Sequence, residues 1–133
     1  RDSHAPGRLD GEQLAWLAEV LDAEPDEPAV IVLHHNIEPE GGSLEDRSAL
    51  WEIIGPRRQV KAVFVGHAHQ YGVNEAQGIH LVRLPATGYK FSDAEPLAWV
   101  LALFDREGCT LELRMLDETS ERNGSIKRLT WRE

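Results

Sequence analysis

The stretch Val63–Gln70 constrains the fold most, because an apolar run ends there at Gly66 and two histidines follow, one residue apart. A short apolar run rich in β-branched residues is typical of a buried strand. Side chains alternate along a strand, so His67 and His69 point the same way if it continues, and a turn at Gly66 can bring both rings onto one ion. Neutral imidazole is a common metal ligand, so we expect a strand that delivers metal ligands. The alternative is a pair of loop histidines in contact with water.

A second apolar run ends in histidine in the same way. Ala29–Leu33 predicts a strand covered on both faces, and His34-His35-Asn36 follows it directly. In open α/β sheets, ligands bind beyond the carboxyl ends of the strands, so two such ends can form one crevice. We expect both sets of histidines to meet there. The alternative for His34 and His35 is a pair of histidines at a buried edge, hydrogen-bonded to the backbone.

The order of the predicted elements indicates an α/β fold. Apolar residues at helical spacing predict a helix from Asp10, its N-cap, to about Glu24, and a second helix from Ser43, also an N-cap, to Ile54. These helices alternate with the strand at 29–33 and with a strand at Lys61–Val65. The two strands should therefore be parallel neighbours joined by a right-handed crossover.

The chain after Gln70 predicts successive strands with short turns, as in an antiparallel meander. The strand over Thr110–Leu116 alternates apolar and charged residues and should have one face in water, whereas the strand over Leu97–Asp105 should be more deeply covered. Further strands are expected over Tyr71–Glu75, Ile79–Leu84 and Ile126–Trp131. The fold class is thus α/β, of an α+β sandwich type, with parallel βα units before the meander.

Charge and length limit the classes of function. The 133 residues include 14 Lys and Arg against 23 Asp and Glu, a formal net charge of -9, which repels a phosphate backbone. We therefore expect no nucleic-acid partner. No apolar run is long enough to cross a bilayer, so we expect no membrane partner. We also expect a cytoplasmic location. The length suits a single domain over residues 1–133.

The two histidine motifs carry a family resemblance. A strand ending in His34-His35 and a later strand ending in Gly66-His67-Ala68-His69 resemble the last two motifs of the calcineurin-like metallophosphoesterase superfamily. The segment 2–17 is similar to the helix before the first of these motifs in the cyclic-nucleotide and glycerophosphodiester phosphodiesterase branch. Leu84–Tyr89 resembles the segment after the second. The match covers most of the chain.

The resemblance implies a sandwich of two sheets flanked by helices, with a two-metal site, of which this chain would be the C-terminal half. By position, His34 and His67 would share one metal ion and His69 would bind the other. His35 and Asn36 would contact substrate or the ligands. The cofactors would be two divalent or trivalent ions, such as Mn, Fe or Zn, that activate a water and neutralise the oxygens of a phosphomonoester or phosphodiester. No catalytic acid or base is assigned.

The specificity loops of the superfamily include the region Pro85–Asp93. Tyr89 lies in this region and could face substrate, but we expect it to pack against its neighbours.

The earlier motifs of the superfamily are absent from this chain. No Gly-Asp or Asn-His pair occurs, and Asp2-Ser3-His4 does not follow an apolar strand. A catalytic zinc-like site takes about three protein ligands, whereas this chain offers two to one ion and one to the other. We therefore expect a fragment that is inactive alone and needs an N-terminal half, in cis or in trans.

Two alternatives belong to other functional classes. The chain could be a noncatalytic module whose histidines bind one metal ion or none. It could instead be an interaction protein, for example a homodimer, that covers a sheet edge left open by the absent half.

Overall fold

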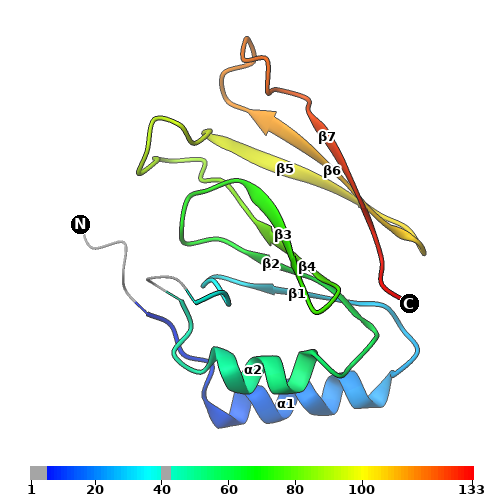
Figure 1. Cartoon of the computed structure of the whole chain (residues 1–133). Coiled ribbons are helices and arrows are strands. Elements are labelled where there is room, and N and C mark those ends of the chain that lie inside the picture. Colours follow the sequence, from blue (N-terminus) through cyan, green and yellow to red (C-terminus); the bar gives the residue numbers. More distant parts are fainter. Residues whose placement is uncertain (1–5, 40–42) are drawn as a thin grey trace.

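The computed structural model describes residues 6–39 and 43–133, and in these ranges two helices and two stacked sheets form three layers (Figure 1). The elements are α1 (Asp10–Ala23), β1 (Ala29–Leu33), α2 (Arg47–Ile54), β2 (Val60–Val65), β3 (Gly72–Ala76), β4 (Ile79–Arg83), β5 (Ala98–Phe104), β6 (Gly108–Met115) and β7 (Ile126–Thr130). This is the expected α/β sandwich. Neither helix is long and apolar enough to cross a membrane. The start of the resemblance, residues 2–5, lies outside the described ranges.

The first sheet has the strand order β1-β2-β4-β3 and is mostly parallel. The expected parallel pairing of β1 with β2 is confirmed, and its register joins Leu33 to Val65. After the β3–β4 hairpin, β4 runs parallel to β2 on its other side. The antiparallel part of the chain is therefore divided, because this hairpin joins the parallel sheet while β5, β6 and β7 form a sheet of their own.

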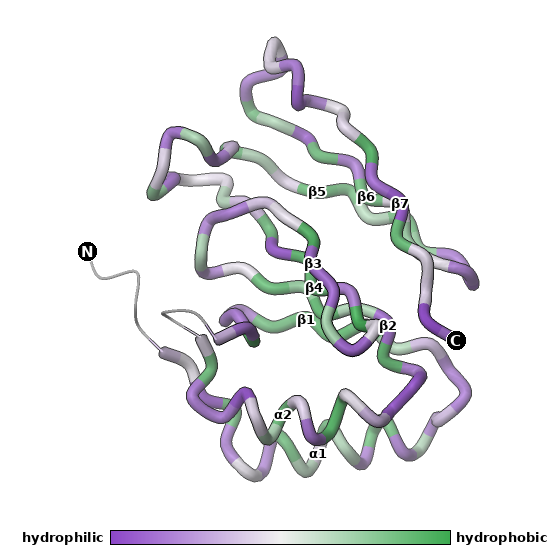
Figure 2. The backbone as a smooth tube through the Cα atoms, in the orientation of Figure 1, coloured by the Kyte–Doolittle hydropathy of each residue, from purple (hydrophilic) through white to green (hydrophobic). Residues whose placement is uncertain are grey.

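The central strand β2 is buried on both faces, which fixes its position between two apolar layers. Val63 and Val65 face the helices, whereas Ala62 and Phe64 face the second sheet and pack with Leu111 of β6. The tube in Figure 2 shows mostly hydrophobic residues along β2 and β4 at this centre. A strand with apolar residues on both faces is stable only where another layer covers each face.

The start of α1 agrees with the sequence and the start of α2 does not. The carboxylate of Asp10 accepts hydrogen bonds of 3.0 Å from the backbone N–H groups of Glu12 and Gln13, as a capping aspartate does. Ser43 does not cap α2, because that helix begins at Arg47. The backbone N–H of Leu44, next to Ser43, instead donates to the carbonyl of Asn36, and this pairing holds the segment outside the helix.

Two strands predicted to be well covered are sheet edges. Val32 of β1 is 74% exposed and Leu103 of β5 is 60% exposed. β6, with buried Cys109, Leu111 and Leu113, is the central strand of the second sheet. The expected cover of β1 on both faces and the deep cover of β5 are therefore wrong, because the exposure of a strand depends on its place in the sheet, which no single strand sequence encodes.

The C-terminal segment is fastened to the first sheet by Arg132. Its guanidinium donates hydrogen bonds of 2.6–3.4 Å to five backbone carbonyls. Three lie at the end of α2, one starts β2 and one lies in the β3–β4 turn: Ile54, Gly55, Arg57, Val60 and Gln77. A cation at a helix C-terminus also offsets the negative end of the helix dipole. Arg132 therefore joins three elements of the first sheet layer.

Replacing Arg132 by alanine should lower the free energy of unfolding by about 2 to 4 kcal/mol, because several carbonyls lose a charged donor at once. Arg132→Lys should restore only part of this loss, since one ammonium group cannot reach all five. The control is Arg114→Ala, which removes an exposed partner of Glu112 and should cost about 0 to 1 kcal/mol. Urea denaturation measures all three. Equal losses for Arg132→Ala and Arg114→Ala would contradict this role.

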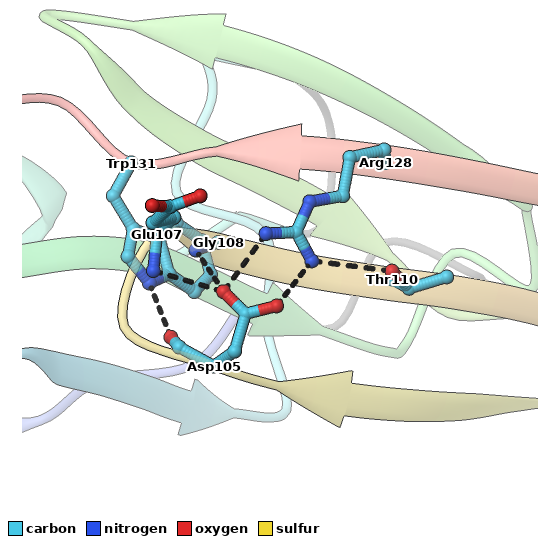
Figure 3. Close-up of polar contacts among 6 residues, drawn as sticks. All are labelled: Asp105, Glu107, Gly108, Thr110, Arg128 and Trp131. Carbon is cyan, nitrogen blue, oxygen red and sulfur yellow. Dashed lines mark hydrogen bonds and ion pairs between the residues drawn. The ribbon is translucent and has the colours of Figure 1, made fainter.

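Asp105 fixes the turn between β5 and β6 and ties it to β7 (Figure 3). Its carboxylate pairs with both terminal nitrogens of Arg128, at 2.7 and 2.8 Å, and accepts the backbone N–H groups of Glu107 and Gly108. The Arg128 guanidinium is the main cause that lowers the pKa of Asp105 from 3.8 to about 2. The carboxylate of Asp105 thus holds Glu107, Gly108 and Arg128 together.

This lowered pKa predicts a pH dependence of stability. Asp105 binds its proton more weakly in the folded state, so its contribution is fully present above pH 3.8 and is lost as the pH falls through about 2. The difference in unfolding free energy between the parent chain and Asp105→Asn should shrink over this window in urea titrations. In an Arg128→Ala background the shrinkage should be smaller. A difference that stays constant with pH would refute the assignment.

Candidate functional site

The peptide ladder between β1 and β2 continues one step beyond the strands and sets the histidines beside each other. The N–H of Gly66 donates to the carbonyl of His34 at 2.9 Å, one position after the pair Leu33–Val65. His34 Nε2 and His67 Nδ1 then lie 3.2 Å apart. Parallel strands end at the same edge of a sheet, and this register places the two motifs together as expected.

The Gly-His-x-His segment leaves the strand in a turn whose histidines have left-handed backbones. The φ angles are 62° at His67 and 53° at His69, and the N–H of Ala68 donates to the carbonyl of Gly66 at 2.7 Å. Such angles cost non-glycine residues of order 1–3 kcal/mol each and are found preferentially at functional sites. The turn gives the two rings different neighbours, because His67 lies against His34 and His35 whereas His69 lies against Tyr89 and Phe91.

The three predicted metal ligands line one pocket of about 310 Å³. His34 is exposed, and His67 and His69 are half-buried. The opposite wall is the segment after β4, Leu84–Tyr89, which is joined to β2 where Leu84 donates its N–H to the carbonyl of Val65 at 2.7 Å. The pocket therefore lies at the carboxyl ends of β1, β2 and β4, where ligands of parallel sheets bind.

The donor atoms fit a metal ion only in part. Two nitrogens bound to one zinc-like ion at about 2 Å lie about 3 Å apart, close to the 3.2 Å between His34 Nε2 and His67 Nδ1. The Nδ1 atom of His69 is buried and has no hydrogen-bond partner among the described residues, so it is available to a ligand. Within residues 6–39 and 43–133, no group of three or more His, Cys, Asp or Glu is arranged to hold a metal ion.

The other two predicted site residues lie behind the pocket. The ring of His35 packs against His67, with centroids 4.5 Å apart, and Asn36 is 2% exposed. Neither is among the residues that line the pocket in the described parts of the chain. The Oδ1 atom of Asn36 is buried without a hydrogen-bond partner among the described residues. Contact with the predicted metal-binding histidines is the role that this position favours for His35, and contact of either residue with substrate stays a prediction.

Gly7 is a site residue that the sequence did not indicate. A Cβ atom at Gly7 would overlap the imidazole of His35, so only glycine lets that ring take its place. The segment is held there because Gly7 pairs with Leu44 and its carbonyl accepts the N–H of Glu45 at 2.9 Å. Pro6-Gly7 indicates only a loop, and the contact arises from a residue far along the chain.

Tyr89 and Phe91 are the other unexpected neighbours of the site. Tyr89 packs in part, as expected, because its ring contacts His69 and Phe91 while 55% of the residue stays exposed, and Phe91 is 48% exposed. Phe91 carried no signal in the sequence, because a single aromatic residue in a polar loop has no periodicity to interpret.

Comparison with known proteins finds sequence relatives of one kind. No protein-family model matches. A probable cyclic nucleotide phosphodiesterase from Psychrobacter sp. (strain PRwf-1) is 33% identical over 91 residues, covering 64% of this chain and 26% of that protein. A 3′,5′-cyclic adenosine monophosphate phosphodiesterase from Haemophilus influenzae is 33% identical over 91 residues, covering 64% and 33%. A probable cyclic nucleotide phosphodiesterase from Synechococcus sp. is 33% identical over 109 residues, covering 74% and 42%. The chain spans less than half the length of each.

A solved structure has the same fold. The crystal structure of a dimetal phosphatase from Danio rerio superposes with a TM-score of 0.73 and 18% sequence identity, over 92% of this chain and 38% of that chain. Nearly all of this chain therefore has a structural equivalent within that longer chain.

Gly7→Ala should displace the ring of His35, because the new methyl group would occupy its position. We expect shifted imidazole resonances of His35 and of its neighbour His67 in ¹H–¹⁵N spectra of the histidine rings. Gly11→Ala is the matched control, since a Cβ there meets nothing within 4 Å. If Gly7→Ala and Gly11→Ala left the histidine resonances equally unchanged, Gly7 would have no positioning role.

Proposed function

We propose that this chain, which belongs to the calcineurin-like metallophosphoesterase superfamily, supplies the histidine ligands of a two-metal phosphoesterase site. The observation that carries the proposal is the convergence of His34, His67 and His69 on one pocket at the ends of parallel strands. Phosphoester hydrolysis is a reaction that such a site performs through bound cations rather than through a side-chain nucleophile.

The residues divide into two ligand groups. His34 and His67 hold one ion through the nitrogens that lie 3.2 Å apart, and His69 holds the second through its buried Nδ1. When bound, the pair of divalent or trivalent cations activates a water molecule and neutralises the phosphate oxygens. Imidazole accepts Mn, Fe, Zn and similar metals, so ligands from elsewhere select among them.

The ligand set is completed by polypeptide that this chain does not include. Two imidazoles for one ion and one for the other are fewer than a catalytic centre takes, and the relatives are more than twice as long as the matched part. We propose that residues 1–133 form the C-terminal half of one domain, and that the remaining ligands come from an N-terminal half in cis or in trans. The chain alone is then inactive.

The open edge of β1 supports such a partner. Exposed Trp16 and Val32 border a small hollow of about 150 Å³ between α1 and β1, next to the side of β1 that pairs with no other strand in the described ranges. An unpaired strand edge with apolar side chains beside it is a template for adding another strand. The N-terminal half is the occupant we propose, and a second copy of this chain is the alternative.

The substrate is proposed to be a small phosphate ester, in the first place a phosphodiester. The relatives named above are cyclic nucleotide phosphodiesterases, and the two cations would offset the repulsion between a chain of net charge -9 and an anionic substrate.

A noncatalytic module is the second candidate. The absence of a three-residue metal-ligand group in the described ranges favours it, as does the exposed edge, which would then serve an interaction with another protein. The sequence that precedes this chain in the gene separates the two candidates. The Asp-x-His, Gly-Asp-x-x-Asp and Asn-His motifs there would support the enzyme, and a stop codon there would favour the module.

The activity is tested by hydrolysis of 3′,5′-cyclic AMP with Mn²⁺, on this chain and on a longer chain that carries the upstream motifs. We expect no turnover above background for residues 1–133 and measurable turnover for the longer chain. His67→Ala in the longer chain should lower kcat by at least about 100-fold, because one ion loses a ligand.

His80→Gln is the control, because it removes a histidine that lies outside the pocket. Nε2 of His80 lies 2.7 Å from the carbonyl oxygen of Thr130. This variant should leave kcat nearly unchanged. Equal turnover with and without His67 would rule out the metal-ligand assignment, and full activity of the short chain would rule out the need for another half.

A further inference from the structure

Beside the proposed metal ligand His69, two exposed aromatic rings form a continuous surface. The ring of Phe91 is stacked on that of His69, with centroids 4.4 Å apart and an angle of 16° between the planes. Tyr89 meets His69 edge-on at 4.6 Å and Phe91 edge-on at 5.5 Å. Tyr89 also lines the histidine pocket. One side of this pair therefore adjoins the place where a phosphate would bind.

The two rings do not serve the core of the protein. Neither Tyr89 nor Phe91 belongs to the two clusters of buried apolar side chains, and about half of each residue is exposed. A single exposed aromatic residue needs no explanation, but two rings in contact beside a candidate site form a patch that can receive a ligand.

The segment that carries the rings is held in place by polar contacts. The carboxylate of Glu95 accepts the N–H of Tyr71 at 3.1 Å, which fastens the segment to the chain just after His69. Arg122 donates to the carbonyl of Ala94 at 3.2 Å from the other side. These contacts fix the end of the segment after Phe91, and the contacts of both rings with His69 hold the rings, so little ordering is required when a ligand binds.

Charge does not explain the patch. The one cation between the two rings in sequence, Lys90, pairs with Asp93 at 3.2 Å on its own segment. Its charge is already engaged, which makes it a weak partner for a phosphate. What the segment offers to a ligand is therefore flat aromatic area, and the natural complement of such an area is another flat ring.

We propose that Tyr89 and Phe91 form a stacking site for the base of a nucleotide, and that they give the site its preference for nucleotides over phosphate esters without a base. This inference rests on the proposed function, because it takes the phosphate to lie at His34, His67 and His69. The base then stacks on the exposed side of the aromatic pair. Stacking does not depend on the identity of the base, because every base has a π face, so both purine and pyrimidine nucleotides should bind.

The test compares adenosine monophosphate with ribose 5-phosphate, which lacks only the base. Dissociation constants are measured by calorimetry with Mn²⁺ present, on residues 1–133 and on the longer chain. Stacking on one aromatic ring contributes about 1 to 3 kcal/mol, or between about fivefold and about 150-fold in affinity. We expect adenosine monophosphate to bind tighter by a factor in this range.

The variants are Phe91→Ala, Tyr89→Ala and the control Phe104→Ala. Phe104 is 53% exposed, contacts Phe64 and Trp131, and lies outside the histidine pocket. The first two should bring the affinity ratio of the two ligands close to one, because they should weaken the binding of adenosine monophosphate far more than that of ribose 5-phosphate. Phe104→Ala should preserve the ratio. Amide spectra verify that each variant is folded.

Two results would overturn the inference. One is an unchanged ratio in Phe91→Ala and Tyr89→Ala. The other is an equal loss for both ligands, which would mean that the rings only orient His69. Failure of the proposed function looks different: no phosphodiester is hydrolysed by any chain, while the base-dependent binding and its loss in the two variants persist.

Discussion

The peptide between Val65 and Gly66 is the one unit on which the arrangement of the pocket depends. Its carbonyl accepts the N–H of Leu84 and its N–H donates to the carbonyl of His34. Both walls of the pocket are thus hydrogen-bonded to the same rigid, planar group. Because β2 is buried on both faces, that group cannot shift without disturbing the two apolar layers that enclose it. The packing of the core around β2 therefore fixes the relative positions of the two pocket walls.

The parts of the fold that a local pattern encodes could be predicted from the sequence. The bounds of β1 and the capping carboxylate of Asp10 depend on residues close together in the chain. The parallel pairing of β1 with β2 joins distant segments, but the order strand, helix, strand indicates it. The convergence of the histidines followed from the general rule on where strands of one sheet end. Their metal-binding role stays a prediction.

What the sequence did not reveal depends on individual contacts that no local pattern indicates. Ser43 looks like a helix cap, but the pairing of Leu44 with Asn36 delays α2 to Arg47. Gly7 looks like an ordinary loop glycine, and its importance comes from the ring of His35 that lies against it. The edge position of β5 was equally invisible, since apolar alternation describes the faces of a strand and is silent on its neighbours in the sheet.

The segment between β4 and β5 begins and ends at one point. Ala86 and Leu97 form a bridge, and the N–H of Ala98 donates to the carbonyl of Ala86 at 2.9 Å, so the ends of the intervening stretch are side by side. The flanking strands place no demand on how long that stretch is or what it contains, because they are already joined at its base. A change of residues in that stretch, which carries Tyr89 and Phe91, therefore leaves the histidines where the sheet holds them.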